Sequence, residues 1–268
     1  MEMHEFVIPY KNGESFYISG LGDLHIGNIA HNKDAMKNAV KFLNDNQCYI
    51  ILMGDLIDAI THTDKRWDIQ SIAPEYRDKT DNLISEQYET LCNYLDMLDP
   101  TKIIGVHTGN HEDKIRERDS RNITYDLCRD YDLKYLGYEA WTRIKFKRDS
   151  HTETFKVFSS HGYGGGKLPQ SKMTPVFQTI NQLDDVDLVM IGHVHDVAVG
   201  RVERRTIPST GSLYLKKKTI AWMLTGSFLT DRVDGSITYP EKKGYGMTKN
   251  GIATFKVYPE SRKIHVSC

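Results

Sequence analysis

Two histidines separated by one residue, His193 and His195, follow an apolar run at positions 188–191, with Gly192 between the run and the pair. In extended backbone, side chains at positions i and i+2 point to the same side, so both imidazoles can face one region of space. Neutral imidazoles that converge in this way commonly bind a metal ion. An isolated pair more often lies on a polar strand face or caps a turn, so its interpretation depends on the other motifs of the chain.

Similar polar clusters follow four earlier β-like runs, and each cluster contains a glycine. In chain order the five clusters are Gly22–His25, Gly54–Asp58, Gly109–Glu112, Ser160–Gly162 and Gly192–His195. They offer carboxylate, amide and imidazole groups at strand ends, where α/β sheets place their functional sites. The glycines allow the backbone to turn sharply beside these groups. Each cluster alone is a weak signal, but the five in this order indicate one shared site.

The order of the motifs, Asp-x-His, Gly-Asp-x-x-Asp, Gly-Asn-His-Glu, a single His and Gly-His-x-His, resembles that of the calcineurin-like metallophosphoesterases. The resemblance extends over about residues 15–200 and implies an α/β fold, a four-layered α/β/β/α sandwich of two mixed sheets with two metal ions at the strand ends. It implies that one metal is bound by Asp23, His25 and His195, and the other by Asn110, His161 and His193. Asp55 would bridge the two ions.

The types of donor agree with that assignment. Imidazole nitrogens with carboxylate and amide oxygens suit Mn²⁺, Fe²⁺ or Zn²⁺, and the set offers no thiolate. We expect two divalent metal ions, Mn²⁺ in the first place, with Fe²⁺ or Zn²⁺ as alternatives. Their charge outweighs the carboxylates of Asp23 and Asp55 and a bridging hydroxide, so the site attracts phosphate. A metal pair of this kind clamps a phosphoryl group while the bridging hydroxide attacks phosphorus in line.

His111 follows the expected ligand Asn110, so its ring should reach the same cleft without binding a metal. The family resemblance implies a catalytic role for His111, as a general acid that protonates or hydrogen-bonds a phosphoryl oxygen. The alternative is a structural histidine that packs against the following helix or caps it. Asp58 and Glu112 are expected to orient ligand imidazoles rather than to react.

Two further motifs fail when their spacing is checked. The segment 162–167, Gly-Tyr-Gly-Gly-Gly-Lys, resembles a phosphate-binding loop, but His161 stands at the position of the first glycine and Leu168 at that of Ser or Thr. The pair at 111–112 begins like a zinc-protease helix, but Ile115 occupies the position of the second histidine. The glycine-rich segment is therefore expected to be a loop beside the metals.

The departures from the family pattern bear on the substrate. The Ser/Thr protein phosphatases continue the second motif with Arg-Gly, whereas Asp58 is followed here by Ala59 and Ile60, which argues against a protein phosphatase. The final motif resembles those of the phosphodiesterase and DNA-repair nuclease branches, although Asp-Val-Ala at 196–198 replaces a proline that often follows it. Three functions remain: nuclease-like hydrolysis of a phosphodiester in DNA or RNA, hydrolysis of a small nucleotide substrate, and a non-catalytic metal-bearing interaction module. The complete set of expected ligands disfavours the third.

The elements that must position these motifs follow from the hydrophobic pattern. Apolar residues at 36, 39, 40 and 43 recur with helical spacing after Asn32, a typical N-cap. Short strands alternate with helices up to residue 106, which indicates an α/β fold. Later strands are expected at 141–147, 154–159, 187–191, 197–202, 219–224 and 252–257, with few helices between them.

We expect a single domain over residues 1–268, with an insertion at 61–98 that ends in a helix near 83–98. Such an insertion forms one wall of a cleft or merely connects two core strands. The content of 39% hydrophobic and 26% charged residues is typical of globular proteins. The chain has no apolar run long enough to span a bilayer and no signal-peptide pattern, so we expect a cytoplasmic protein without membrane contact, with its four cysteines reduced.

Charge is distributed unevenly, although the net charge is −1. Residues 197–268 contain 13 Lys and Arg against 5 Asp and Glu, which gives +8, and residues 1–196 carry the remaining −9. Basic residues follow the last metal motif at Arg201, Arg204, Arg205 and 216–218. We expect them to flank the cleft and contact a nucleic-acid backbone, unless they form an ordinary solvated face.

Overall fold

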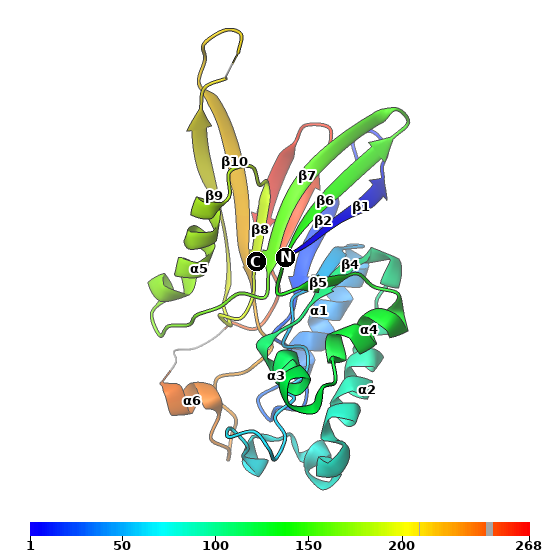
Figure 1. The fold of residues 1–268 in the computed structure, drawn as a ribbon, viewed down its shortest axis with the longest axis vertical. Helices are drawn as coiled ribbons and strands as arrows, with labels where there is room; N and C mark the ends of the chain where they lie inside the picture. The colour runs from blue at the N-terminus through cyan, green and yellow to red at the C-terminus, as the bar shows by residue number, and fades with distance from the viewer. Residues whose placement is uncertain (209, 245–248) are drawn as a thin grey trace.

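The computed structural model describes residues 1–208, 210–244 and 249–268. The described chain forms two six-stranded mixed sheets (Figure 1). The first sheet has the order β1 (Glu2–Pro9), β6 (Glu139–Arg148), β7 (His151–Ser160), β8 (Leu188–Ile191), β10 (Lys216–Thr225) and β9 (Val197–Thr206). The second has the order β12 (Lys263–Ser267), β11 (Thr254–Tyr258), β2 (Phe16–Leu21), β3 (Tyr49–Leu52), β4 (Ile103–His107) and β5 (Tyr135–Gly137).

Helices cover the outer faces of the two sheets. The second sheet packs against α1 (Lys33–Asp45), α2 (Leu83–Leu95), α3 (Asn110–Asp119) and α4 (Ile123–Tyr131), and the first against α5 (Pro169–Gln182). The short helix α6 (Tyr239–Lys243) and 3-10 turns at Ile69–Ser71, Pro74–Asn82 and Pro100–Lys102 complete the described elements. The four-layered α/β/β/α sandwich expected from the sequence is therefore confirmed. None of the described helices combines the length and apolarity needed to cross a membrane.

The central strands are apolar on both faces because each face meets another layer. Along β3, Ile50 and Leu52 pack under the helices, whereas Ile51 packs between the two sheets. Strand β8 alternates in the same way, with Met190 between the sheets and Ile191 against the α5 side. Strands buried on both faces appear in the sequence as continuous apolar runs, which is why these segments were recognisable.

The expected helix after Asn32 is confirmed as α1, and the Asn32 side chain accepts a hydrogen bond from the backbone N–H of Ala35 at 2.9 Å. The expected later strands are confirmed as β6 to β11. Strands β1, β5 and β12 and helices α4, α5 and α6 were not expected. Strands β1, β5 and β12 lie at sheet edges and have few buried positions, so their pattern is weak. The sequence does not predict α5 because its first residue is Pro169 and a second proline, Pro175, lies inside it.

The strands that carry the motifs run in parallel within each sheet. Strand β3 pairs in parallel with β2 and β4, and β8 pairs in parallel with β7 and β10. The carboxyl ends of these strands lie at the edge of the sheets that faces away from the tip of the β9–β10 hairpin (Figure 1). All five polar clusters follow a strand at this edge, as the sequence predicted.

One buried histidine connects the two sheets. His107 ends β4, and its Nδ1–H donates to the backbone oxygen of Gly137 in β5 at 3.0 Å. Its Nε2 accepts a hydrogen bond from Ser159 Oγ of β7, in the other sheet, at 2.8 Å. Burial lowers the pKa of His107 to about 3, so the ring is neutral in the folded protein at neutral pH.

We predict that His107→Ala destabilises the fold by about 2–4 kcal/mol, because two buried polar partners lose their bonds and a cavity remains. An unfolded histidine binds a proton below its ordinary pKa of 6.5, whereas folded His107 does so only near pH 3. The unfolded state therefore takes up more protons across this window, and wild-type stability falls as the pH falls from 6.5 to 3.

Urea unfolding at a series of pH values measures both effects. His107→Ala should show a lower midpoint at pH 7 and a flatter pH dependence below pH 6.5. His151→Ala, which removes an exposed histidine on β7, is the matched control and should leave both unchanged. An unchanged midpoint for His107→Ala would contradict the prediction.

Candidate metal centre

The five clusters bring metal-binding atoms together in groups that share Asp55. One group consists of Asp23, His25, Asp55 and His195, and a second of Asp55, His161 and His193. Within each group the candidate ligand atoms all lie within 4.8 Å of one another. Both groups draw on both sheets, because the loops after β2 and β3 meet those after β7 and β8. Each group could therefore hold a metal ion.

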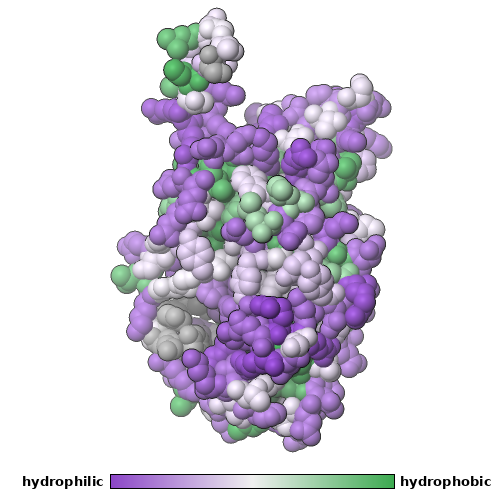
Figure 2. All heavy atoms as spheres, in the orientation of Figure 1, coloured by the Kyte–Doolittle hydropathy of each residue, from purple (hydrophilic) through white to green (hydrophobic). Residues whose placement is uncertain are grey.

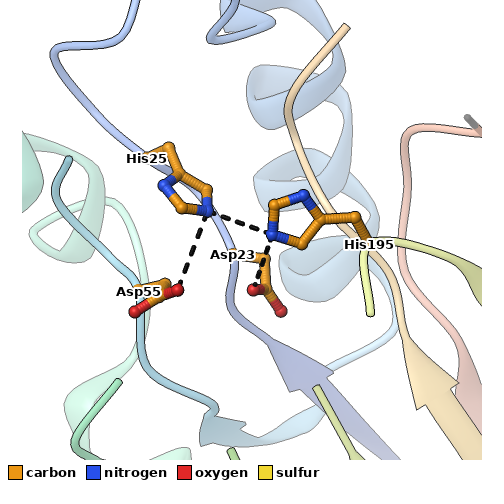
Figure 3. A group of neighbouring side chains, drawn as sticks. All are labelled: Asp23, His25, Asp55 and His195. Carbon is orange, nitrogen blue, oxygen red and sulfur yellow. Dashed lines mark hydrogen bonds and ion pairs between the residues drawn. The ribbon is translucent and has the colours of Figure 1, made fainter. Parts of the chain in front are cut away.

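In the first group the rings of His25 and His195 point toward one another beside the two carboxylates (Figure 3). Their Nε2 atoms are 3.2 Å apart, and His195 Nε2 lies 3.2 Å from Asp23 Oδ1. His25 Nε2 lies 3.8 Å from Asp55 Oδ2. Four donor atoms from three loops thus face a common point.

The polar atoms of the first group are not all satisfied by contacts within the group, and a bound cation would satisfy them better. Asp23 Oδ1 is buried and makes no hydrogen bond among the described residues, and its contact with His195 Nε2 at 3.2 Å is an ion pair only if that ring is protonated. The facing Nε2 atoms of His25 and His195 can share at most one N–H···N hydrogen bond, and this bond leaves Asp23 Oδ1 without one. A divalent ion would satisfy the nitrogens and the orphaned oxygen together.

The second group surrounds His161, which is fully buried. Its Nε2 lies 3.4 Å from Asp55 Oδ2, 3.2 Å from Asn110 Oδ1 and 3.3 Å from His193 Nδ1. Asn110 thereby joins the group that the sequence assigned to it, as an amide oxygen beside two imidazoles and a carboxylate. Because Asp55 Oδ2 approaches His25 and His161 alike, this carboxylate is placed to bridge the two groups.

Two of the candidate ligand rings are oriented by a contact at their other nitrogen. His161 Nδ1–H donates to the backbone oxygen of Met53 at 2.8 Å. His25 Nδ1 lies 3.3 Å from Asp58 Oδ1, and the amide of Asn28 donates to both Asp58 oxygens at 3.2 and 3.3 Å. Each contact turns Nε2 toward the metal groups. The expectation that Asp58 orients an imidazole is confirmed, and Asn28 is a supporting residue that the motifs did not reveal.

Glu112 has a different role from the expected one. Within the described residues its carboxylate makes no hydrogen bond to an imidazole but accepts four from backbone N–H groups, a pattern that the motif alone does not predict. The donors are the N–H groups of Asp55 at 3.0 Å, Leu56 at 2.6 Å, Ile57 at 3.2 Å and Gly109 at 3.1 Å. The expectation that Glu112 orients a ligand ring was therefore wrong: Glu112 holds the backbone of the Asp55 loop, and at the same time caps the start of α3.

Gly109 makes this contact possible. A Cβ atom at this position would lie 2.1 Å from the backbone nitrogen of Asp55, so no other residue lets the two loops approach so closely. The approach also places the N–H of His111 at 2.8 Å from Asp55 Oδ1. One oxygen of Asp55 is thus bound by the protein, and the other faces the metal groups.

Five of the seven expected ligands have left-handed backbone conformations. The φ angles are 50° for Asp23, 48° for His25, 49° for Asp55, 69° for His193 and 50° for His195. This region costs a non-glycine residue about 1–2 kcal/mol, although Asp and His tolerate it better than most. Backbone hydrogen bonds hold several of these residues in place, including Asp23 N–H to Gly54 O at 2.9 Å and His25 N–H to Asp55 O at 3.0 Å.

The buried charges of the second group are coupled. Burial opposes the ionisation of both Asp55 and His161, but their mutual attraction outweighs it. The pKa of Asp55 is therefore held well below its ordinary value by His161 and His111, and Asp55 raises the pKa of His161 to about 10. In the metal-free protein a proton thus balances the Asp55 charge, and a metal that binds here replaces that proton.

His111 lies beside these groups with its ring fixed in one orientation. Its Nδ1 is hydrogen-bonded to the backbone oxygen of Asp58, which can only accept, so Nδ1 carries the proton. Its ring centroid lies 4.6 Å from that of His25, and its Nε2 lies 3.2 Å from Nη1 of Arg66. His111 thus lies beside the two groups, as the sequence predicted, and with His25 and Asp58 it forms a third cluster of possible metal-binding atoms.

A cavity of about 300 Å³ opens above the metal groups. Its lining includes the expected site residues His25, Asp55, Asn110, His111, His193 and His195. The insertion contributes Arg66, Asp68 and Ser71, so it does form one wall, and the glycine-rich segment contributes 164–166. The sequence offered no specific signal for Arg66, Lys172 or Lys242, the three cations of the lining, because each belongs to a segment without a motif.

The basic residues after the last motif do not flank this cavity, so their expected position was wrong. Strand β10 ends near the site at Thr225, which pairs with Val197, whereas Lys216 pairs with Thr206 at the other end of the hairpin. Nine residues of strand separate the two ends of β10, which corresponds to roughly 30 Å. Long antiparallel pairing thus carries the basic residues away from the metal groups.

The hairpin itself has a mixed surface. Its tip exposes the apolar side chains of Ile207, Leu213, Tyr214 and Leu215, and Figure 2 shows apolar residues gathered there above a hydrophilic surface. Of the basic residues, Lys218 is paired with Asp185 and Asp187, so its charge is already balanced within the protein.

We predict that Glu112→Ala lowers the stability of the fold by more than about 3 kcal/mol, because four buried backbone donors lose a charged acceptor. It should also abolish metal binding although Glu112 is not a ligand, since the Asp55 loop loses its geometry. Thermal unfolding and metal titration measure the two effects. Glu117→Ala, an exposed glutamate on the same helix, is the control, and a Glu112→Ala protein that binds metal normally would contradict the prediction.

No family model matches the sequence. The DNA polymerase II small subunit of Thermoplasma acidophilum is 22% identical over 230 residues, which cover 72% of this chain and 44% of that protein. The chain therefore spans less than half the length of this curated relative. Among solved structures, a metallophosphoesterase from Sphaerobacter thermophilus gives a TM-score of 0.38 at 12% identity, covering 94% of this chain and 87% of that one. GAP50, the anchor in the inner membrane complex of Plasmodium, gives 0.42 at 10% identity, covering 94% and 88%.

The structure of the chain agrees with the architecture and the motif positions that the sequence resemblance implies. Two mixed six-stranded sheets lie between helical layers, and each of the five motifs follows the strand that the resemblance assigns to it. The motif residues meet in two groups that share one aspartate. The chain therefore has the two-sheet α/β/β/α architecture and the converging motif residues that the resemblance to the calcineurin-like metallophosphoesterases implies.

Proposed function

We propose that this chain is a metal-dependent phosphodiesterase that acts on a nucleic-acid strand. One observation carries the proposal: seven expected ligands from five strand ends converge in two groups that share Asp55, and His111 lines the cavity beside them. A structural role accounts poorly for this set, because it buries several imidazoles beside two carboxylates and leaves Asp23 Oδ1 without a hydrogen bond among the described residues.

The assignment of the ligands follows the two groups. Asp23, His25, Asp55 and His195 would hold one divalent ion, and Asp55, Asn110, His161 and His193 the other. Bound there, the ions would supply Lewis-acid stabilisation of the phosphoryl oxygens and a water of lowered pKa. The chain itself fixes the distance between the groups through Asp55, whose second oxygen is held by the N–H of His111.

His111 lies at the wall of the cavity that the insertion forms, where it can act as a proton or hydrogen-bond donor. Its ring cannot turn without breaking the bond to Asp58 O, so Nε2 stays directed into the cavity. From there it can hydrogen-bond a phosphoryl oxygen or give a proton to the leaving oxygen. No other histidine of the described cavity lining is free of the expected metal groups.

The choice of a nucleic-acid substrate rests on two supports. The final motif resembles those of the phosphodiesterase and nuclease branches, and a relative matched over 72% of this chain is a DNA polymerase subunit. A small nucleotide is the second candidate. It is favoured by the cavity of about 300 Å³ and by the distance of the basic hairpin residues from it.

We predict that the purified protein binds two divalent ions per chain under saturating Mn²⁺, because seven ligand side chains exceed what one ion accommodates. Asp55→Asn should lower the occupancy of both sites, since it weakens the shared ligand, whereas Asn110→Ala should weaken only one. Elemental analysis after gel filtration, together with calorimetric titration, measures the occupancy. A single saturable site in the wild type would remove the dinuclear assignment.

We further predict Mn²⁺-dependent hydrolysis of a generic phosphodiester, with little hydrolysis of a generic phosphomonoester. Single-stranded DNA, duplex DNA and mononucleotides, tested in parallel, identify the substrate class. DNA cleavage supports the nucleic-acid assignment, whereas turnover of mononucleotides alone supports the second candidate.

His111→Ala provides the matched control for these assays. It should retain both metals and lose about two to four orders of magnitude in turnover, as expected when a general acid or oxyanion donor is removed. Near-normal turnover would mean that His111 is structural. A metal-loaded wild type without activity on any of these esters would overturn the proposed function.

A further inference from the structure

The insertion contributes an arginine whose position is fixed by a buried carboxylate. Arg66 donates from Nη2 to Asp64 Oδ2 at 2.9 Å and from Nε to Asp64 Oδ1 at 3.2 Å. The side chain of Asp64 is only 3% exposed, whereas that of Arg66 is 36% exposed. Asp64 also accepts the backbone N–H of Arg66 at 2.9 Å, so the loop and the guanidinium are held as one unit. This bidentate pairing uses one edge of the guanidinium and leaves the other edge free.

Nη1 of Arg66, which takes no part in the bond to Asp64, points toward His111 in the cavity. This atom lies 3.2 Å from His111 Nε2, and Arg66 is the one arginine lining the cavity in the described part of the chain. Because the proton of His111 is on Nδ1, Nε2 is the acceptor of this bond. An anionic oxygen accepts from a guanidinium more strongly than a neutral imidazole does, so a phosphate can take over this donor.

Arg66 does not have a carboxylate partner of its own. Asp64 also binds Arg118 of α3, so one carboxylate pairs with two guanidinium cations. Arg118 Nη1 is buried and has no hydrogen-bond partner among the described residues. The other two cations of the cavity differ: Lys172 lies 3.2 Å from Asp196 and Lys242 3.0 Å from Asp68, and each lysine charge is matched by its own carboxylate.

We infer that Arg66 is the phosphate-binding residue of the site and that its Nη1 binds a non-bridging oxygen of the scissile phosphoryl group beside His111. The inference rests on the proposed function, which it deepens by naming the residue that recognises the anion. Arg66 supplies from the insertion a guanidinium that the second motif lacks, since Ala59 follows Asp58. Asp64 is its positioning residue.

A purely structural explanation makes a different prediction. If the Asp64 cluster only fastened the insertion to α3, removing either arginine would have the same consequence, because both bind the same carboxylate. If Arg66 binds phosphate, only its removal weakens anion binding, because Arg118 does not line the cavity. Arg118→Ala is therefore the matched control for Arg66→Ala.

The test measures the binding of inorganic phosphate to the Mn²⁺-loaded full chain by calorimetry, which needs no turnover. Arg66→Ala should raise the Kd for phosphate about 10- to 100-fold, the loss of one charge-assisted hydrogen bond. Arg66→Lys should recover part of the affinity, and Arg118→Ala should stay within about twofold of the wild type. Metal occupancy should be the same in all of these proteins. In turnover of the diester, Arg66→Ala should raise KM by a factor similar to the change in Kd.

Each outcome decides the inference. Phosphate binding that is unchanged in Arg66→Ala, or equally weakened in Arg118→Ala, overturns it, as does a metal-loaded wild type that binds no phosphate. If phosphate binds in an Arg66-dependent way but none of the esters is hydrolysed, the inference stands and the proposed function fails. Thermal unfolding shows whether the variants remain folded; should Arg66→Ala unfold, Arg66→Gln is measured in its place against the same criteria.

Discussion

The carboxylate of Glu112 is the contact on which the metal centre depends. It binds backbone N–H groups from the loop after β3 and from the turn before α3, and so joins two neighbouring strand ends through their main chains. A side chain can change its direction by rotating about its bonds. The two main-chain segments that share the Glu112 carboxylate cannot move independently of each other. Asp55, the candidate ligand shared by the two groups, is therefore held in position by a residue of a helix that is not adjacent to it in the chain. This explains how loops can hold a bridging group in a defined place.

The site also depends on how the two sheets are packed. Each metal group combines ligands from the loops of the second sheet with histidines from the loops of the first. The apolar residues between the sheets, including the fully buried Phe146, Phe155 and Phe255, set the separation of these loops. A change that shifted one sheet against the other would open both groups together. The packing of the core between the sheets therefore determines the geometry of the candidate metal centre.

The central strands and the site were predictable because both leave local signals. Apolar runs such as β3 and β8 end in polar clusters with glycine, and this combination identified the seven expected ligands and His111 as residues that lie together in the fold. Edge strands such as β1 escaped because few of their residues are buried. The role of Glu112 and the contact of Arg66 with His111 could not be read from the sequence, because their partners lie 45 to 57 residues away and include backbone atoms. The distance of Lys216 from the site depended on a hairpin longer than expected.

The left-handed backbone at Asp23, His25, Asp55, His193 and His195 has a consequence for the evolution of such sites. Glycine would occupy these positions with less strain, so the ligand residues are locally the less stable choice. A descendant chain that kept the fold but lost the need for metals would gain stability by replacing them, and its motifs would disappear first at the left-handed positions. A degenerate member of this architecture could therefore be recognised by glycine or asparagine at these places, with the surrounding strands intact.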